Sequence, residues 1–154
     1  MKLFGHPLHP LLIHFPTALL PMDLALTFLY HTNNNESFYQ AGAYCLWAGT
    51  AVGLLAIVTG LPDLLAIPRT HKKAMALGLY HGALNGSIIL SFAVIAYRSW
   101  QVFPTPSLAG IAGLVTKGIL VVTLFVGNYM GGRLIYTHHV GLNLKTESNE
   151  NLTP

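Results

Sequence analysis

The sequence predicts an all-α integral membrane protein that folds as a four-helix transmembrane bundle. Three observations predict this class. Apolar residues make up 53% of the 154 residues and charged residues only 8%, whereas a soluble domain carries about 25% charged residues. The mean hydropathy is +0.53. The apolar residues also gather in four runs, each long enough for a transmembrane helix, which needs about 20 residues.

The four runs are expected to form helices over residues 8–30, 40–66, 74–97 and 108–136. With the segments between them they make one four-span transmembrane domain, residues 1–142. The first run is too long and too rich in proline for a signal peptide, so we interpret it as a retained first helix. The last residues, 143–154, are polar and are expected to be disordered.

The basic residues predict how the bundle is oriented. With four spans, both termini and the second loop share one side of the membrane, and the only basic residue of the other side is Arg98. By the positive-inside rule, both termini are expected to be cytoplasmic, in a bacterial inner membrane. The six basic residues on the expected cytoplasmic side are Lys2, Arg69, Lys72, Lys73, Arg133 and Lys145.

Seven of the eight histidines fall at this cytoplasmic end. In the opening motif GHPLHPLLIHFP, His6 and His9 are expected to precede the first helix and His14 to lie inside it. At 1.5 Å per residue, His14 is roughly 6 Å into the first helix and His81 roughly 10 Å into the third, so they are expected at similar depth. Histidine is costly there unless it binds something or has a partner. The others are His71, His138 and His139.

Two imidazoles at one depth on different helices are suited to the axial positions of haem b. The leading hypothesis is therefore a b-type haem protein that passes electrons near the cytoplasmic face, with His14 and His81 as axial ligands. The glycines of the third helix make room for a flat cofactor, and Arg133 suits a propionate. Further candidates for the ligand role are His9, His71 and His139.

Two other interpretations stay open. His14, His81 and Asp63 are candidate ligands of another transition metal, such as zinc, copper or nickel. Alternatively, the histidines pair with the backbone and lipid headgroups, and the protein is a non-catalytic membrane subunit. A self-contained enzyme is not expected, because no serine or cysteine sits beside a histidine–carboxylate pair, and Cys45 is the only cysteine.

The expected partners follow from composition and size. The chain has no basic run with interleaved aromatic residues, so nucleic acid is not expected as a partner. The lipid bilayer is the expected surrounding. A bundle this small leaves little soluble surface for a substrate, so a redox or membrane-protein partner, or an oligomer, is expected.

A polar stripe on the fourth helix predicts an ion pair. Lys117 and Asn128 point the same way, because the residues between them make about three helical turns. This face must look into the bundle, since a lysine that faces lipid is expensive. The expected partner is Asp23 of the first helix, in an intramembrane ion pair that aligns helices one and four, with a proton-relay role as the alternative.

Glycines recur on the second and third helices at spacings that place them on one face. Such stripes let the backbones of neighbouring helices approach closely in lipid, or make room for a cofactor. The glycines are Gly42, Gly49, Gly53 and Gly60 on the second helix and Gly78, Gly82 and Gly86 on the third.

Three segments resemble the bacterial membrane-protein family known as domain of unknown function 2231: GHPLHPLLIHFPTALL, GLPDLLAIP and GGRLIYTHHVG. The resemblance runs from Gly5 to Gly141. It implies a small four-helix membrane domain, joined to redox domains in some relatives, and no established activity. The arrangement is also distantly similar to four-helix membrane b-type cytochromes, which commonly carry histidine ligands in both leaflets. Here only His31 lies near the outer side.

Overall fold

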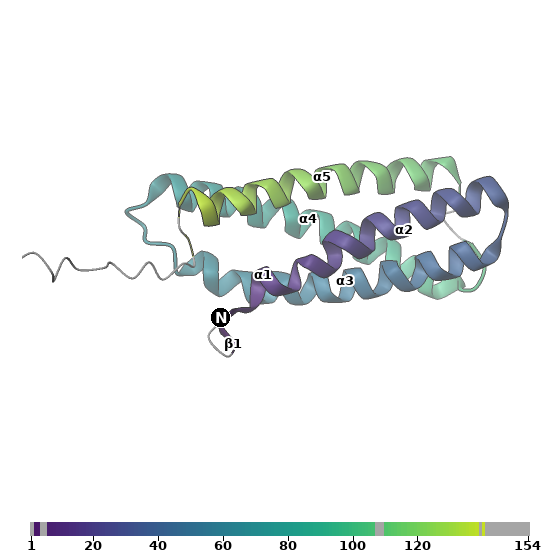
Figure 1. Cartoon of the computed structure of the whole chain (residues 1–154), viewed down its shortest axis with the longest axis horizontal. Helices are drawn as coiled ribbons and strands as arrows, with labels where there is room; N and C mark the ends of the chain where they lie inside the picture. The colour runs from purple at the N-terminus through teal and green to yellow at the C-terminus, as the bar shows by residue number, and fades with distance from the viewer. Residues whose placement is uncertain (1, 4–5, 107–109, 139, 141–154) are drawn as a thin grey trace, which may run out of the picture.

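The computed structural model describes residues 2–3, 6–106, 110–138 and 140, and the described chain is almost entirely helical (Figure 1). A two-residue antiparallel pair of strands precedes the helices. The strands are β1 (Lys2–Leu3) and β2 (His6–Pro7). The helices are α1 (Leu8–Leu12), α2 (His14–Asn33), α3 (Glu36–Leu65), α4 (Lys72–Val102) and α5 (Ile111–Tyr136). The all-α class predicted from the sequence is confirmed.

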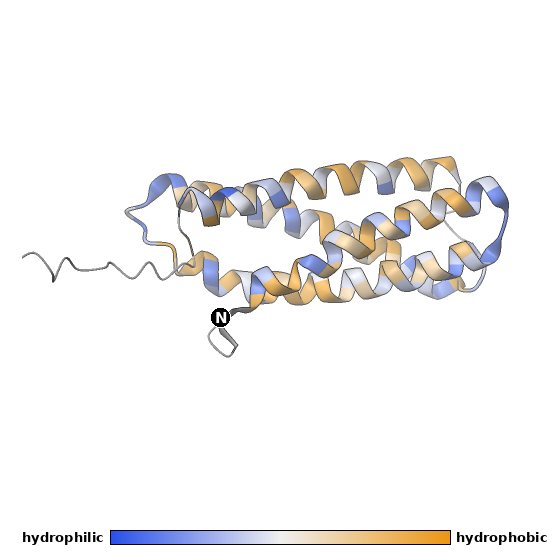
Figure 2. Cartoon of the chain, in the orientation of Figure 1, coloured by the Kyte–Doolittle hydropathy of each residue, from blue (hydrophilic) through white to orange (hydrophobic). Residues whose placement is uncertain are grey.

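Four segments are long and apolar enough to cross a membrane: α1 with α2, then α3, α4 and α5. They run up and down in a bundle in which α2 packs on α3 and α5, α4 packs on the same two helices, and α1 packs on α3. Apolar residues cover the middle of the helices, and polar residues gather toward the ends (Figure 2). This distribution is the one that a bilayer requires of a multi-pass membrane protein.

The first span is broken at Ile13, where the sequence predicted one continuous helix. Pro16 explains the break, because a proline lacks the N–H that would bond the carbonyl four residues earlier and its ring crowds that carbonyl. The Thr17 hydroxyl donates to the Ile13 carbonyl at 2.7 Å. The break leaves α1 as a separate turn of helix that packs against α3. His9 therefore lies within a helix, whereas it was expected to precede the first helix.

α3 and α4 are longer than the apolar runs suggested. α3 begins at Glu36 and α4 continues to Val102, so only two residues join α2 to α3. Asn34 adopts the left-handed conformation that ends α2, and the Asn35 side chain accepts a hydrogen bond from the Ser37 N–H at the start of α3. Polar capping residues thus allow helices to extend beyond the apolar span.

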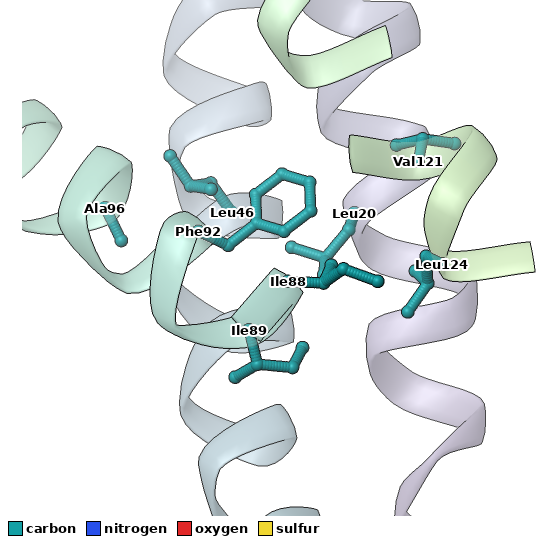
Figure 3. Close-up of a cluster of buried hydrophobic side chains, with 8 residues drawn as sticks. All are labelled: Leu20, Leu46, Ile88, Ile89, Phe92, Ala96, Val121 and Leu124. Carbon is teal, nitrogen blue, oxygen red and sulfur yellow. The ribbon is translucent and has the colours of Figure 1, made fainter. Parts of the chain in front are cut away.

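The apolar core lies in the middle of the bundle, where all four spans contribute side chains (Figure 3). Phe92 and Leu20 are fully buried. Because lipid tails are as apolar as these side chains, packing and not water exclusion holds the spans together. The cluster consists of Leu20, Leu46, Ile88, Ile89, Phe92, Ala96, Val121 and Leu124.

The glycines of α3 lie at close helix contacts. A Cβ at Gly49 would lie 3.1 Å from the Leu19 Cβ, and one at Gly53 would lie 2.7 Å from the Ile89 side chain. On α4, Gly78 also lies at a close contact, because a Cβ there would lie 2.8 Å from the Leu64 side chain, whereas a Cβ at Gly86 would meet nothing within 4 Å. The stripe on α3 is therefore a packing surface for α2 and α4.

We predict that Gly49→Ala destabilises the bundle by about 1–3 kcal/mol, because its Cβ would meet an atom fixed to the α2 backbone and the two helices would have to separate. Thermal unfolding in detergent measures the effect. Gly86→Ala is the matched control and should leave the midpoint unchanged or higher, since alanine favours helix. Equal midpoints for the two variants would contradict the packing role of Gly49.

Candidate functional site

His9 and His81 meet inside the bundle, although they are far apart in sequence. Their rings lie 6.2 Å apart between centroids, with planes at 87°. His9 reaches this position from α1, and His81 from the third turn of α4. Both side chains are partly buried. Since both helices belong to membrane spans, the pair places two titratable rings together in an apolar part of the protein.

Each ring is held by a backbone carbonyl on a further helix. His9 Nδ1 lies 2.8 Å from the Ala56 carbonyl oxygen on α3, and His81 Nδ1 lies 3.0 Å from the Gly127 carbonyl oxygen on α5. A carbonyl oxygen can only accept a hydrogen bond, so the hydrogen is on Nδ1 in both rings. Neither Nε2 has a hydrogen bond within the part of the chain that the structure describes. In a neutral ring, Nε2 then carries the lone pair that binds metals.

Asn85 sits one turn after His81 and supports it. Its Nδ2 lies 3.2 Å from His81 Nδ1 and 2.9 Å from the His81 carbonyl oxygen. Since His81 Nδ1 already donates to Gly127, the amide cannot also donate to that nitrogen, and it donates to the carbonyl. Asn85 therefore packs beside the ring while it bonds the backbone of the same turn.

Glycines make room for these polar side chains. A Cβ at Gly60 of α3 would lie 2.9 Å from His9 Nδ1, and one at Gly131 of α5 would lie 2.8 Å from His81 Cε1. A Cβ at Gly127 would clash with the Asn85 amide. The helices thus approach closely at each ring, and the glycines fix where the rings lie.

The polar layer continues to α2 through Asn128, the neighbour of Gly127. Asn128 Nδ2 donates to the Thr17 hydroxyl at 3.0 Å. We call the five side chains of His9, Thr17, His81, Asn85 and Asn128 the histidine layer. It connects all four spans in the half of the bundle that holds the end of α3 and the start of α4.

His14 does not take part in this layer. Its side chain is exposed, and its Nδ1 lies 3.3 Å from the carbonyl of Leu11 in the preceding turn. The structure therefore brings His9, and not His14, beside His81. Residues five apart on a helix point to different faces, so His9 and His14 diverge, and the packing of α1 on α3 places His9 beside His81.

The remaining predicted ligands do not join the pair in a cluster. His71 and Arg133 are exposed, and Asp63 is partly buried in the last turns of α3. His139 lies outside the described residues, as do residues 143–154. Within the described residues, no three histidine, cysteine or carboxylate side chains come together to hold a metal ion. A metal site of His14, His81 and Asp63 is therefore not formed.

A second polar cluster lies on the other side of the apolar core. Lys117 Nζ on α5 donates to Asp23 Oδ1 on α2 at 2.7 Å, and to the Thr27 hydroxyl at 2.9 Å. The side chains of Asp23 and Lys117 are 1% and 7% exposed. The structure thus brings together the two residues expected to pair. Leu20, Val121 and Leu124 separate this cluster from the histidine layer along α2 and α5.

Several residues of the site carry no strong signal in the sequence. Thr17, Gly127 and Gly131 resemble ordinary helix-packing residues, and the Ala56 carbonyl has no signature at all. The position of Thr27 beside the ion pair could be predicted from the sequence, because Thr27 lies one helical turn from Asp23 on the same face. The spacing of Gly127 and Gly131 is the small-xxx-small pattern that marks a close contact.

The fold and its polar layers define a class: a multi-pass membrane protein of four spans with titratable side chains inside the bundle. A family model described as "Predicted membrane protein (DUF2231)" matches residues 5–143. The chain belongs to this family. No curated protein and no solved structure matches the chain.

We predict that Asp23→Asn and Lys117→Met each destabilise the bundle by about 3–5 kcal/mol, because each leaves a buried polar partner uncompensated. The double variant should lose less than the sum of the two, with a coupling energy of at least about 1 kcal/mol. Unfolding of the reconstituted or detergent-solubilised protein measures all three. Additive losses would mean that the two residues do not stabilise the fold as a pair.

Proposed function

We propose that the protein is a b-type haem protein of the membrane, with His9 and His81 as the axial ligands, and that it transfers electrons without catalysing a reaction of its own. One observation carries the proposal. The rings of two histidines on different spans lie 6.2 Å apart between centroids, with planes at 87°, and both are oriented through Nδ1 by backbone carbonyls. Histidine ligands are almost always held in this way, by a hydrogen bond from the other ring nitrogen.

The ring separation fits a shared metal. Imidazole nitrogens bind metals at about 2.0–2.1 Å, so two rings on opposite sides of one metal have centroids roughly 6–6.5 Å apart. The observed 6.2 Å falls in this range. His9 and His81 would hold the haem group through their Nε2 atoms. The residues present therefore fit the group, which when bound would supply one-electron chemistry.

The number of protein ligands favours haem over a simple metal ion. Zinc sites take three or four ligands from the protein, whereas haem needs only two, since the macrocycle supplies the others. His9 and His81 bring two, and within the described residues no third side chain of the metal-binding kind joins them. For this reason we prefer haem to zinc, copper or nickel.

Cationic side chains lie at the end of the bundle nearest the histidine layer. Arg133 is exposed two residues beyond Gly131, and Arg69, Lys72 and Lys73 are exposed where α3 connects to α4. Such cations suit the propionates of a haem. The two histidines would hold the group, and Gly60 and Gly131 leave space for the two rings.

We predict that the protein purified from cells supplied with haem shows a Soret band and, on reduction, the spectrum of a six-coordinate haem b. His9→Ala and His81→Ala should each abolish bound haem or leave five-coordinate haem, because each removes one axial ligand. Absorption spectra, with haem quantified per protein, measure this.

His14→Ala is the matched control, since His14 lies only one helical turn from the site but is exposed. It should keep the full spectrum. A wild-type protein without a Soret band would overturn the haem proposal, and loss of haem in His14→Ala with retention in His9→Ala would overturn the choice of ligand.

We also propose that the histidine layer lies in the cytoplasmic half of a bacterial inner membrane, with both termini cytoplasmic. The exposed cations Arg69, Lys72, Lys73 and Arg133 all lie at this end, and the positive-inside rule places such residues in the cytoplasm.

We predict that alkaline phosphatase fused after Tyr136 is inactive, whereas the same enzyme inserted at Asn34 is active, because it folds only outside the cytoplasm. Green fluorescent protein fusions at the same two positions should give the reverse result. The opposite pattern would invert the proposed orientation.

A further inference from the structure

The ion pair of α2 and α5 leaves one carboxylate oxygen without a partner. Both contacts to the carboxylate converge on Asp23 Oδ1, from Lys117 Nζ at 2.7 Å and from the Thr27 hydroxyl at 3.3 Å. Asp23 Oδ2 is buried and has no hydrogen bond within the described residues. A buried carboxylate shares its charge over both oxygens, so an unpaired Oδ2 is costly in an apolar environment.

Few other ionisable groups surround this carboxylate. Lys117 faces it from α5, and Cys45 on α3 is the other ionisable group that interacts electrostatically with it. Gly42 of α3 packs directly against it, since a Cβ there would lie 3.3 Å from Asp23 Oδ1. α1 and α4 contribute no ionisable group to the contacts of Asp23 in the described part of the chain. The charge on Asp23 is therefore balanced by Lys117 alone.

The Asp23–Lys117 pair lies on the side of the apolar core opposite the histidine layer. At 1.5 Å per residue, Asp23 lies about 15 Å along α2 from Asn33, and Lys117 about 9 Å along α5 from Ile111. Thr27 and Tyr30 follow Asp23 at helical spacing on the same face of α2, in the direction of the Asn33 end. Hydroxyl groups can pass protons, because each both donates and accepts.

We propose that Asp23 Oδ2 is a proton-binding site, filled from the Asn33 end of the bundle, and that proton binding there dissolves the Asp23–Lys117 ion pair and loosens α2 from α5. The proton comes from the aqueous phase and forms an O–H bond at Oδ2, which leaves a neutral carboxylic acid beside Lys117. The Lys117–Thr27 and Thr17–Asn128 hydrogen bonds are then the remaining side-chain hydrogen bonds between these helices in the described chain. The site is independent of any haem at His9 and His81.

Infrared difference spectroscopy of the full-length protein in lipid vesicles tests this proposal. Acidification should produce the carbonyl band of a buried carboxylic acid in the wild type, and Asp23→Asn should lose that band. Glu36→Gln is the matched control for an exposed carboxylate and should keep it. In Lys117→Met, the band should already be present at neutral pH, because no cation remains to hold the charge. Identical difference spectra for the wild type and Asp23→Asn would overturn the proposal.

Stability against pH gives a second readout that does not depend on assigning a band. Because only the wild type can bind a proton at Asp23, its stability should change with pH through the transition, whereas Asp23→Asn should lack this step. If Asp23→Asn fails to fold, Thr27→Val serves instead, since it removes only the hydroxyl that bonds Asp23 Oδ1 and should slow or shift the infrared change. A stability profile shared by the wild type and both variants would also overturn the proposal.

Discussion

The structure depends on one constraint: polar groups inside a membrane-spanning bundle must find partners within the bundle. The chain meets this constraint in two layers. The histidine layer satisfies its imidazole N–H groups with backbone carbonyls of α3 and α5, and the Asp23–Lys117 pair satisfies two charges with each other. In water, solvent would satisfy these groups at little cost. In hydrocarbon each missing partner costs several kcal/mol, roughly the stability of a whole helix contact.

Both polar layers help to hold the bundle together. Each contains a side-chain hydrogen bond between α2 and α5, and the apolar core lies between them. The contact of α3 with α2 is different, because glycines bring those two backbones close. α2 and α5 are thus joined by specific hydrogen bonds, whereas α2 and α3 are held by close packing of their backbones. These specific bonds give the bundle a defined helix register, although apolar packing in lipid discriminates poorly between alternative registers.

The proposed haem site and the proposed proton site share a physical logic. Both use a side chain with one atom held in place and another left available: Nε2 in the histidines and Oδ2 in Asp23. The hydrogen-bonded atom fixes the orientation of the side chain, and the other atom is available to bind a metal or a proton. Gly60 and Gly131 serve the first site by admitting the rings, and Thr27 serves the second by bonding Lys117.

The sequence by itself determined the class, the number of spans and the Asp23–Lys117 pair. Composition and run length decide membrane insertion, and a carboxylate and a lysine in mid-span have few partners to choose from. Only the tertiary structure decided which histidine meets His81. His9 and His14 point to different faces of the first span, and the packing of α1 on α3 brings His9, and not His14, to His81. The carbonyls of Ala56 and Gly127 are present in every residue type, so their role becomes visible only when the backbones are placed in space.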